Sequence, residues 1–543
     1  MAVAALLAWR LHVSGVQPYG SDGAQHIEHF ARLRLLAMLR GADSLNPLAL
    51  LVEADGSFPP LLHLLTLAAG AVTGHGIGAA TALSGVWLLL LAAAVASCAR
   101  ELGGRPSAAF TATLLIPALH GAAARYYYDL PMTAALWWAV ALLLGGRGRL
   151  LAPALAGVVA PGAALIKWAA LPLGAPLLLG ALVGAKRSGR ERALEAAIGG
   201  TVAVLLCGAF LWGSGSDNSF SMQSQATWGG TAPSQWAVEG TGNPMLLVLG
   251  RLGERLIDAG WRGLAFYPLR LATSVLSPLG AVALLALLVA GRSGLRRLVP
   301  LAGVVVLGEA VVLLLVVPVW DDRFLLPAVP LLALAAGLAF ERVSARRWTA
   351  GLVAIGLLVA WDFHAGPEGP HNREVVLLED GGEHLPRTFA RGLTAAGSEE
   401  RRGWSRRDED RPPREAFREA IWGAIERCES VSPALLSERV LVHDDGDHVG
   451  FQVRALEQVL LEGGRRVEPE AACIPDAPPS AAQRAGRLDL LITGRGQGLA
   501  LPACAEPQRW WASAVVDDPE GGQGAILWRP EGRPGCPGDA VAD

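Results

Sequence analysis

The sequence predicts a polytopic α-helical membrane protein that carries a small α/β soluble domain at its C-terminus. Three observations predict it: an apolar composition, a series of apolar segments of membrane-spanning length, and a change of charge between body and tail. Hydrophobic residues make up 52% of the 543-residue chain and charged residues only 17%, whereas soluble globular proteins carry about 25% charged residues. This composition excludes a single water-soluble fold and a chain disordered over most of its length.

The charge of the chain divides it into a basic body and an acidic tail. Residues 1–363 contain 25 Lys and Arg against 18 Asp and Glu, a net charge of +7, and residues 364–543 contain 21 against 31, a net charge of −10. The acidic tail argues against a nucleic-acid partner. We therefore divide the chain into a transmembrane domain (1–363), a charged linker (364–415) and an α/β domain (416–543).

The body contains a series of candidate membrane spans. A helix needs about 20 apolar residues to cross a bilayer, and about 17 are tolerated. The candidate segments are 77–98, 107–124, 131–145, 150–166, 168–184, 194–213, 271–291, 298–318, 324–341 and 347–363. Residues 1–9 are also apolar but end at Arg10, so we interpret them as a truncated first span. This gives about 11 spans in total.

The basic residues predict the orientation of these spans. If residues 77–98 cross from outside to inside, 14 Lys and Arg fall in the loops of one side and three in the short loops of the other. The positive-inside rule places the side with 14 in the cytoplasm. By parity, residues 59–74 should form a re-entrant or juxtamembrane helix rather than a full crossing. The tail should then lie outside the cytoplasm, and outer loops should cover residues 14–58 and 214–268.

The tail has the pattern of a small exported α/β domain. Residues 438–464 predict a strand, an acidic loop and a helix, residues 488–494 a further strand, and residues 513–530 a hairpin around a Gly-rich turn. The tail contains four cysteines, Cys428, Cys473, Cys504 and Cys536, and an even number in an exported domain favours disulfides. We predict no metal site there, because the acidic loop at 443–448 lacks the spacing of an EF-hand.

Two carboxylates on the predicted outer side each have two interpretations. Asp22, in the first outer loop, either caps a helix that lies along the membrane surface or takes a proton from an attacking hydroxyl. Asp129 follows three consecutive tyrosines and precedes Leu130 and Pro131, so it either begins the next helix or is a second acid of the same site.

Two cations on the outer side are candidates for phosphate recognition. Lys167 is one of only two lysines in the chain and lies between two apolar segments. A charge at membrane depth costs roughly 2.5–3.5 kcal/mol on insertion scales and marks a candidate functional site; the alternative is a lysine that extends to the membrane surface. Arg323 has Asp321 and Asp322 as candidate ion-pair partners. Lys binds phosphate as a point charge and Arg as a bidentate fork.

The order of these motifs resembles a known family. The matching features are Asp22 in the first outer loop, Pro59-Pro60-Leu61, Arg125-Tyr126-x-x-Asp129-x-Pro131, Lys167-Trp168 and the RFLLPAVP stretch at 323–330. Together they resemble the protein O-mannosyltransferase and lipid A aminoarabinose transferase group, which is family 39-like and has the C-type glycosyltransferase fold. The resemblance covers roughly residues 14–345.

The resemblance implies an integral membrane glycosyltransferase that transfers a sugar from a polyprenyl-phosphate donor to an extracytoplasmic glycan, lipid or protein. Asp22 would then be the catalytic general base and Asp129 the second acid, while Lys167, Arg125 and Arg323 would bind the donor phosphate. The chain departs from the family at Gly23, where many members have Glu, and at Phe58, where many have Lys. Loss of that Glu weakens any inferred metal contact, so we expect no cofactor and leave a divalent cation open.

The expected location is the cell membrane, namely the bacterial inner membrane, with several spans and an extracytoplasmic C-terminal domain. Two other classes of protein remain as alternatives. A multi-span transporter should show repeated halves and interrupted helices, and the sequence has no convincing repeat. A non-catalytic membrane scaffold that presents the tail would not need Lys167.

Overall fold

The computed structural model describes one set of helices and one set of strands. The described residues are 61–73, 77–123, 127–145, 151–167, 169–185, 188–213, 267–268, 271, 285, 289, 292–315, 322–342 and five strands between 439 and 530. Several predictions lie outside these residues: those for Asp22, Arg125, the outer loop 14–58, the linker 364–415 and the four tail cysteines. The helices belong to one compact unit and the strands to another.

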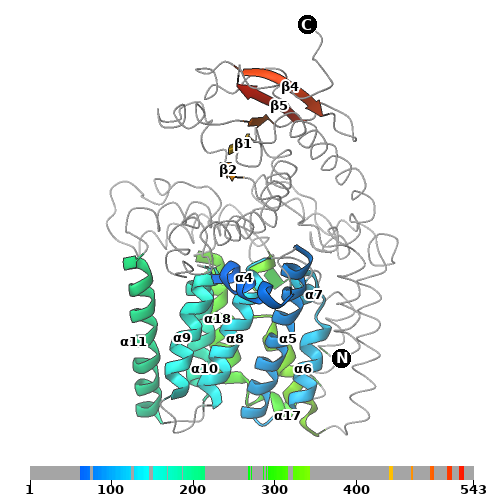
Figure 1. The fold of residues 1–543 in the computed structure, drawn as a ribbon. Coiled ribbons are helices and arrows are strands. Elements are labelled where there is room, and N and C mark those ends of the chain that lie inside the picture. The colour runs from blue at the N-terminus through cyan, green and yellow to red at the C-terminus, as the bar shows by residue number, and fades with distance from the viewer. Residues whose placement is uncertain are drawn as a thin grey trace, which may run out of the picture. The chain divides into compact units, whose positions relative to one another are not determined.

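The helical unit is a bundle of mostly parallel or antiparallel helices (Figure 1). Its α-helices are α4 (Leu61–Thr73), α5 (Ile77–Glu101), α6 (Pro106–Leu115), α7 (Pro117–Ala123), α8 (Asp129–Gly145), α9 (Leu151–Ile166), α10 (Ala170–Gly184), α11 (Gly189–Gly213), α17 (Arg292–Leu295), α18 (Val299–Leu315) and α19 (Pro330–Ala339). Two 3-10 turns, η3 (Asp322–Leu325) and η4 (Phe340–Arg342), flank α19. α8 packs against α5, α9 and α10, and α10 packs against α18.

Most helices begin and end close to the predicted apolar segments, with two corrections. The predicted span 107–124 is two helices, because the chain is extended at Ile116 (φ −74°, ψ 117°) and α7 begins at Pro117. Proline lacks an N–H and disfavours helical backbone at the residue before it. The predicted span 324–341 is the turn η3 followed by α19, which begins at Pro330.

Length and composition together mark one candidate membrane crossing among the described residues. In the described part of the chain, Leu83–Glu101 of α5 is the one stretch that is long and apolar enough to cross a membrane by length and composition. Seven further apolar helices are shorter, at 10–17 residues. Residues 59–74 do contain a helix, α4, which lies across one end of the bundle (Figure 1). The total of about 11 spans and the re-entrant placement of α4 stay predictions.

The bundle is built around α8 and has an apolar exterior. Thirteen of the 17 residues of α8 are buried, and the Trp137 indole N–H donates a hydrogen bond of 2.9 Å to the carbonyl oxygen of Pro327, in the turn before α19. On the outside, α11 exposes Val204 and Leu205, and α18 exposes Leu307. Exposed apolar surface of this kind marks a membrane or an interaction surface.

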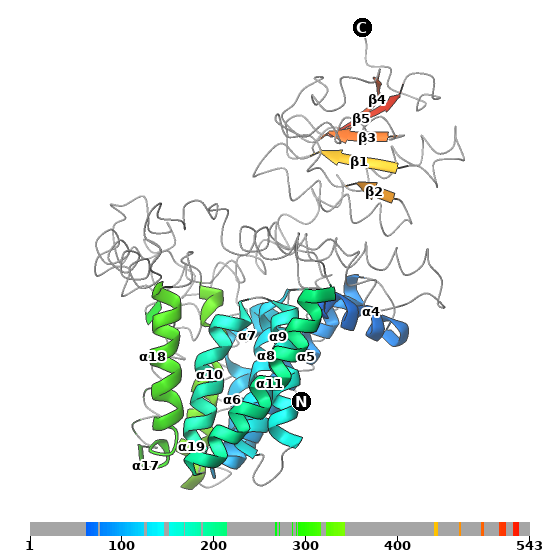
Figure 2. The ribbon, with the colours of Figure 1, turned by 90° about the vertical axis from the view of Figure 1, so that its left-hand side faces the viewer.

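The strand unit is a five-stranded mixed sheet with the order β2-β1-β3-β5-β4 (Figure 2). Its strands are β1 (Arg439–His443), β2 (Arg466–Glu468), β3 (Leu490–Thr493), β4 (Trp510–Val516) and β5 (Ala525–Pro530). β1 pairs in parallel with β2 and β3, while β5 pairs antiparallel with β3 and β4. Four strands, including the hairpin, lie where the sequence predicts them. β2 was not predicted, because it has three residues, two of them charged.

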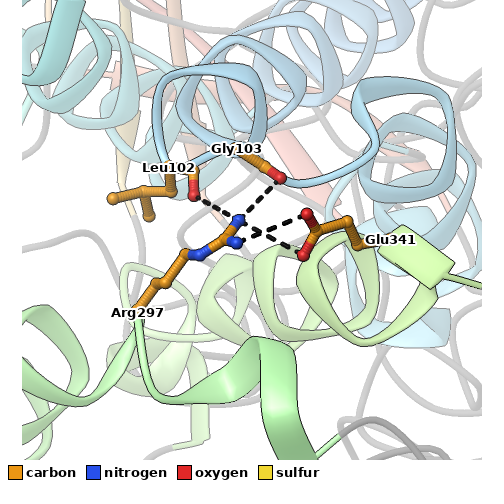
Figure 3. A network of polar contacts seen from close by, with 4 residues as sticks. All are labelled: Leu102, Gly103, Arg297 and Glu341. Atoms are coloured by element: carbon orange, nitrogen blue, oxygen red, sulfur yellow. Dashed lines mark hydrogen bonds and ion pairs between the residues drawn. The ribbon is translucent and has the colours of Figure 1, made fainter.

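An arginine shortly after α17 joins three segments (Figure 3). α17 lies at the end of the bundle opposite α4 (Figure 1). Arg297 Nη1 donates to the carbonyl oxygens of Gly103 (2.9 Å) and Leu102 (3.4 Å), which follow α5 directly. The same guanidinium pairs with Glu341 of η4, with Nη1–Oε2 at 3.2 Å. Carbonyls at a helix C-terminus lack partners within the helix and attract cations, so Arg297 ties the end of α5 to the segments beside α18 and α19.

We predict that Gly103→Ala destabilises the bundle. Gly103 has φ +76°, and an added Cβ would lie 2.7 Å from Arg297 Nη1. The left-handed conformation alone costs a non-glycine residue about 1–2 kcal/mol. The matched control is Gly85→Ala in the interior of α5, where nothing lies within 4 Å of the added Cβ; it should be neutral or stabilising by about 0.5–1 kcal/mol. Thermal unfolding of both purified variants measures the difference, and equal unfolding temperatures would contradict this account.

Candidate functional site

A buried ion pair joins two of the residues that the sequence singled out. Lys167 Nζ lies 2.7 Å from Asp129 Oδ1, and the two side chains are only 8% and 3% exposed. Asp129 is the first residue of α8, and Lys167 follows the last residue of α9. A buried charge is tolerated when an opposite charge and hydrogen bonds compensate for lost hydration. The pair therefore fixes the start of α8 against the end of α9.

A second cation, Arg323, lies near this pair, and the same two aromatic rings contact both cations. Lys167 Nζ lies 5.2 Å from the ring centroid of Tyr127 and 5.4 Å from that of Phe324. The guanidinium carbon of Arg323 lies 5.6 Å from the same two centroids, and its Nη1 donates a hydrogen bond to the Tyr127 hydroxyl. These distances are within the range of cation–π attraction. Both cations thus share one pair of rings, an arrangement that gathers positive charge in one place.

α4 is joined to the same segment through a histidine. His63 Nε2 and the Tyr128 hydroxyl share a hydrogen bond of 2.6 Å, and both residues are buried. Because Tyr128 lies between Tyr127 and Asp129, this bond ties α4 to the backbone that carries the ion pair. The sequence signal for this bond is a single histidine within the apolar segment 59–74.

Two buried polar atoms beside the pair have no hydrogen-bond partner within the described residues. They are Asp129 Oδ2 and Thr133 Oγ1, which lie one helical turn apart on α8 and so on the same face. Buried polar atoms are nearly always hydrogen-bonded, so each exception calls for an explanation. A ligand that donates to the carboxylate and contacts the hydroxyl would satisfy both.

The structure brings together three of the five predicted site residues: Asp129, Lys167 and Arg323. Asp22 and Arg125 lie outside the described residues. The alternative for Lys167, a lysine that extends to the membrane surface, is wrong, since its ammonium is buried against Asp129. Among the described residues, no three His, Cys, Asp or Glu side chains form a group that could hold a metal ion. The divalent cation that the sequence left open therefore stays open.

Comparison with known proteins decides the fold. The chain is similar to ArnT from Cupriavidus metallidurans bound to undecaprenyl phosphate, with a TM-score of 0.54, 16% identity and 97% of each chain covered. The apo state of that protein gives a TM-score of 0.51 at 17% identity, again over 97% of each chain. The chain has a C-type glycosyltransferase-like fold.

This similarity confirms the sequence resemblance at the level of the fold. A weaker similarity, with a TM-score of 0.43 and 11% identity, is to an oligosaccharyltransferase from Archaeoglobus fulgidus tethered to an acceptor peptide, over 96% of this chain and 73% of that one. No protein-family model and no curated protein sequence matches the chain.

We predict that Lys167→Met destabilises the bundle far more than removal of the whole pair. The single variant leaves the Asp129 carboxylate buried without its cation, which typically costs about 3–5 kcal/mol. The double variant Asp129→Leu/Lys167→Met replaces the pair by apolar side chains of similar size, a change that is often neutral. Thermal unfolding of the purified variants measures both.

The control for this prediction is Arg100→Gln, which breaks the exposed pair with Glu101. An exposed pair of this kind contributes about 0–1 kcal/mol, so this variant should unfold close to the wild-type temperature. A double variant as unstable as Lys167→Met would show that the pair does not act as a unit.

Proposed function

We propose that the chain is an integral membrane glycosyltransferase that transfers a sugar from a polyprenyl-phosphate donor to an extracytoplasmic glycan, lipid or protein. The observation that carries the proposal is the cluster of Lys167 and Arg323 beside Asp129, within a C-type glycosyltransferase-like fold. One neighbour with this fold, ArnT, was crystallised with undecaprenyl phosphate. A polyprenyl phosphate is therefore the ligand class that we test first.

The two cations suit a phosphate that leaves with developing negative charge. Fixed positive groups in a water-poor site stabilise such charge more strongly than they would in water. A lysine ammonium has three N–H donors, so it can bind a carboxylate and a phosphate oxygen together. Arg323 would supply the fork that binds two phosphate oxygens. In this proposal Arg125 adds a third positive charge to the phosphate site.

The two carboxylates take different roles in the proposed transfer. Asp22 would accept the proton of the attacking acceptor group as the bond between the sugar and the phosphate breaks. Asp129 would hold Lys167 in place through Oδ1 and contact the substrate through Oδ2. We keep it in the site as the second acid, since its free oxygen is the atom that can receive a hydrogen bond from substrate.

The exterior of the bundle supports a lipid-linked substrate. The exposed apolar side chains of α11 and α18 suit contact with acyl chains, and the neighbours with this fold are membrane enzymes. We propose that the chain resides in the bacterial inner membrane with its cation cluster and its C-terminal domain on the extracytoplasmic side. The basic loops predicted on the other side support this orientation.

We predict that the cation cluster binds undecaprenyl phosphate. Arg323→Gln and the double variant Asp129→Leu/Lys167→Met should each weaken binding by about 10- to 100-fold, the effect of losing a charge-assisted hydrogen bond. Binding of labelled lipid to the purified full-length chain in nanodiscs measures this, with Arg100→Gln as a control that should bind like the wild type. Unchanged binding in both site variants would refute the phosphate assignment.

We predict that Asp22→Asn strongly slows transfer and leaves donor binding intact. Asn caps a helix about as well as Asp, so folding should be preserved, whereas loss of a general base costs roughly 10²–10⁴-fold in rate. The assay screens polyprenyl-phosphate sugars with the wild-type chain and then compares the variant on the donor found. Asp129→Asn should lose less activity. An Asp22→Asn enzyme with a normal rate would leave only the capping role for this residue.

A further inference from the structure

A cavity lies between α18 and α19, and its lining does not include the ion pair. It has a volume of about 530 Å³, and Tyr267 and Leu325 line it together with the apolar faces of the two helices. Pockets that bind drug-sized ligands measure about 300–1,000 Å³. The cavity is therefore large enough for an organic molecule or for part of a lipid chain.

One buried carboxylate breaks the apolar lining of this cavity. Glu309 lies in the third turn of α18, is 3% exposed, and neither of its carboxylate oxygens has a hydrogen-bond partner within the described residues. Among the described lining residues, Glu309 carries the only charged side chain. Burial of an unpaired carboxylate is costly, and such groups are rare in proteins unless a partner completes them. The lining thus lacks a group that donates hydrogen bonds to Glu309.

We propose that this cavity binds an amphiphile whose apolar part fills the pocket and whose protonated amine binds Glu309. An acidic side chain in the lining favours a cationic over an anionic headgroup, so we assign an amine rather than a phosphate to this cavity. The described lining lacks a positive charge and hydrogen-bond donors for the two carboxyl oxygens. An ammonium group supplies both. The attraction is strong because the surroundings are apolar. This binding does not depend on the proposed transfer reaction.

The cavity and the cation cluster share one structural element. Leu325 of η3 lines the cavity, while the preceding residue, Phe324, contacts both Lys167 and Arg323. A ligand in the cavity would therefore contact the same turn, η3, whose Phe324 ring contacts both cations.

The test measures binding of labelled dodecylamine to the full-length chain in phosphatidylcholine nanodiscs at pH 7, where the amine is protonated. Loss of the charge-assisted hydrogen bond in Glu309→Gln should weaken saturable binding about tenfold or more. The matched control is Glu195→Gln, which changes a glutamate that is also buried but lies on α11, outside the cavity lining. It should bind dodecylamine like the wild type.

Two further measurements distinguish the contribution of the amine charge from that of the apolar chain. Dodecanol has the same chain without the charge, so it should bind the wild type about tenfold more weakly and be insensitive to Glu309→Gln. Ala302→Phe, which places a ring in the cavity lining, should remove binding of both probes. Dodecylamine binding of wild-type affinity in Glu309→Gln, or saturable binding that persists in Ala302→Phe, would overturn the proposal. Dodecanol that binds the wild type as tightly as dodecylamine would overturn it as well.

Discussion

One interaction, the buried ion pair between Lys167 and Asp129, determines how the segments of the candidate site meet. Neither charge could stay at this depth alone, because an isolated buried charge loses its hydration without compensation. The pair therefore requires α8 and α9 to meet at one point, and that contact holds the preceding tyrosines in place. Tyr127 then contacts Arg323, and Tyr128 binds His63 of α4. One electrostatic constraint thus organises four segments into a single site.

Charges in this fold are handled in three physically different ways. The Lys167–Asp129 pair is buried, and each charge compensates for the lost hydration of the other, so each partner requires the other. The Arg297 side chain is partly exposed, so water screens its charge. It binds both Glu341 and the carbonyl oxygens that follow α5 (Figure 3). Glu309 is buried without a described partner. The first arrangement suits a reactive site, the second a structural tie, and the third a site that a ligand completes.

The fold was predictable to the extent that apolar runs end at charges or prolines. The segments 131–145 and 150–166 match α8 and α9 to within two residues at every boundary, because polar or charged residues bound both runs. The span expected at 107–124 failed because Pro117 breaks the helix within an otherwise continuous apolar run. Strand β2 was missed for a different reason: three residues carry too little pattern for a strand, and its pairing with β1 forms it.

The sequence by itself singled out Asp129, Lys167 and Arg323 as candidates, because each is a charge next to a long apolar segment. It could not identify their partners. Lys167 and Asp129 are 38 residues apart, and Arg323 is 196 residues from Tyr127, so no local periodicity relates them. Helix packing decides these contacts: it turned two isolated charges into an ion pair and brought the aromatic rings between the cations. Helix packing also places Glu309 in the lining of a cavity without a described hydrogen-bond partner. Burial and hydrogen bonding are properties of the folded chain, so the sequence does not reveal them.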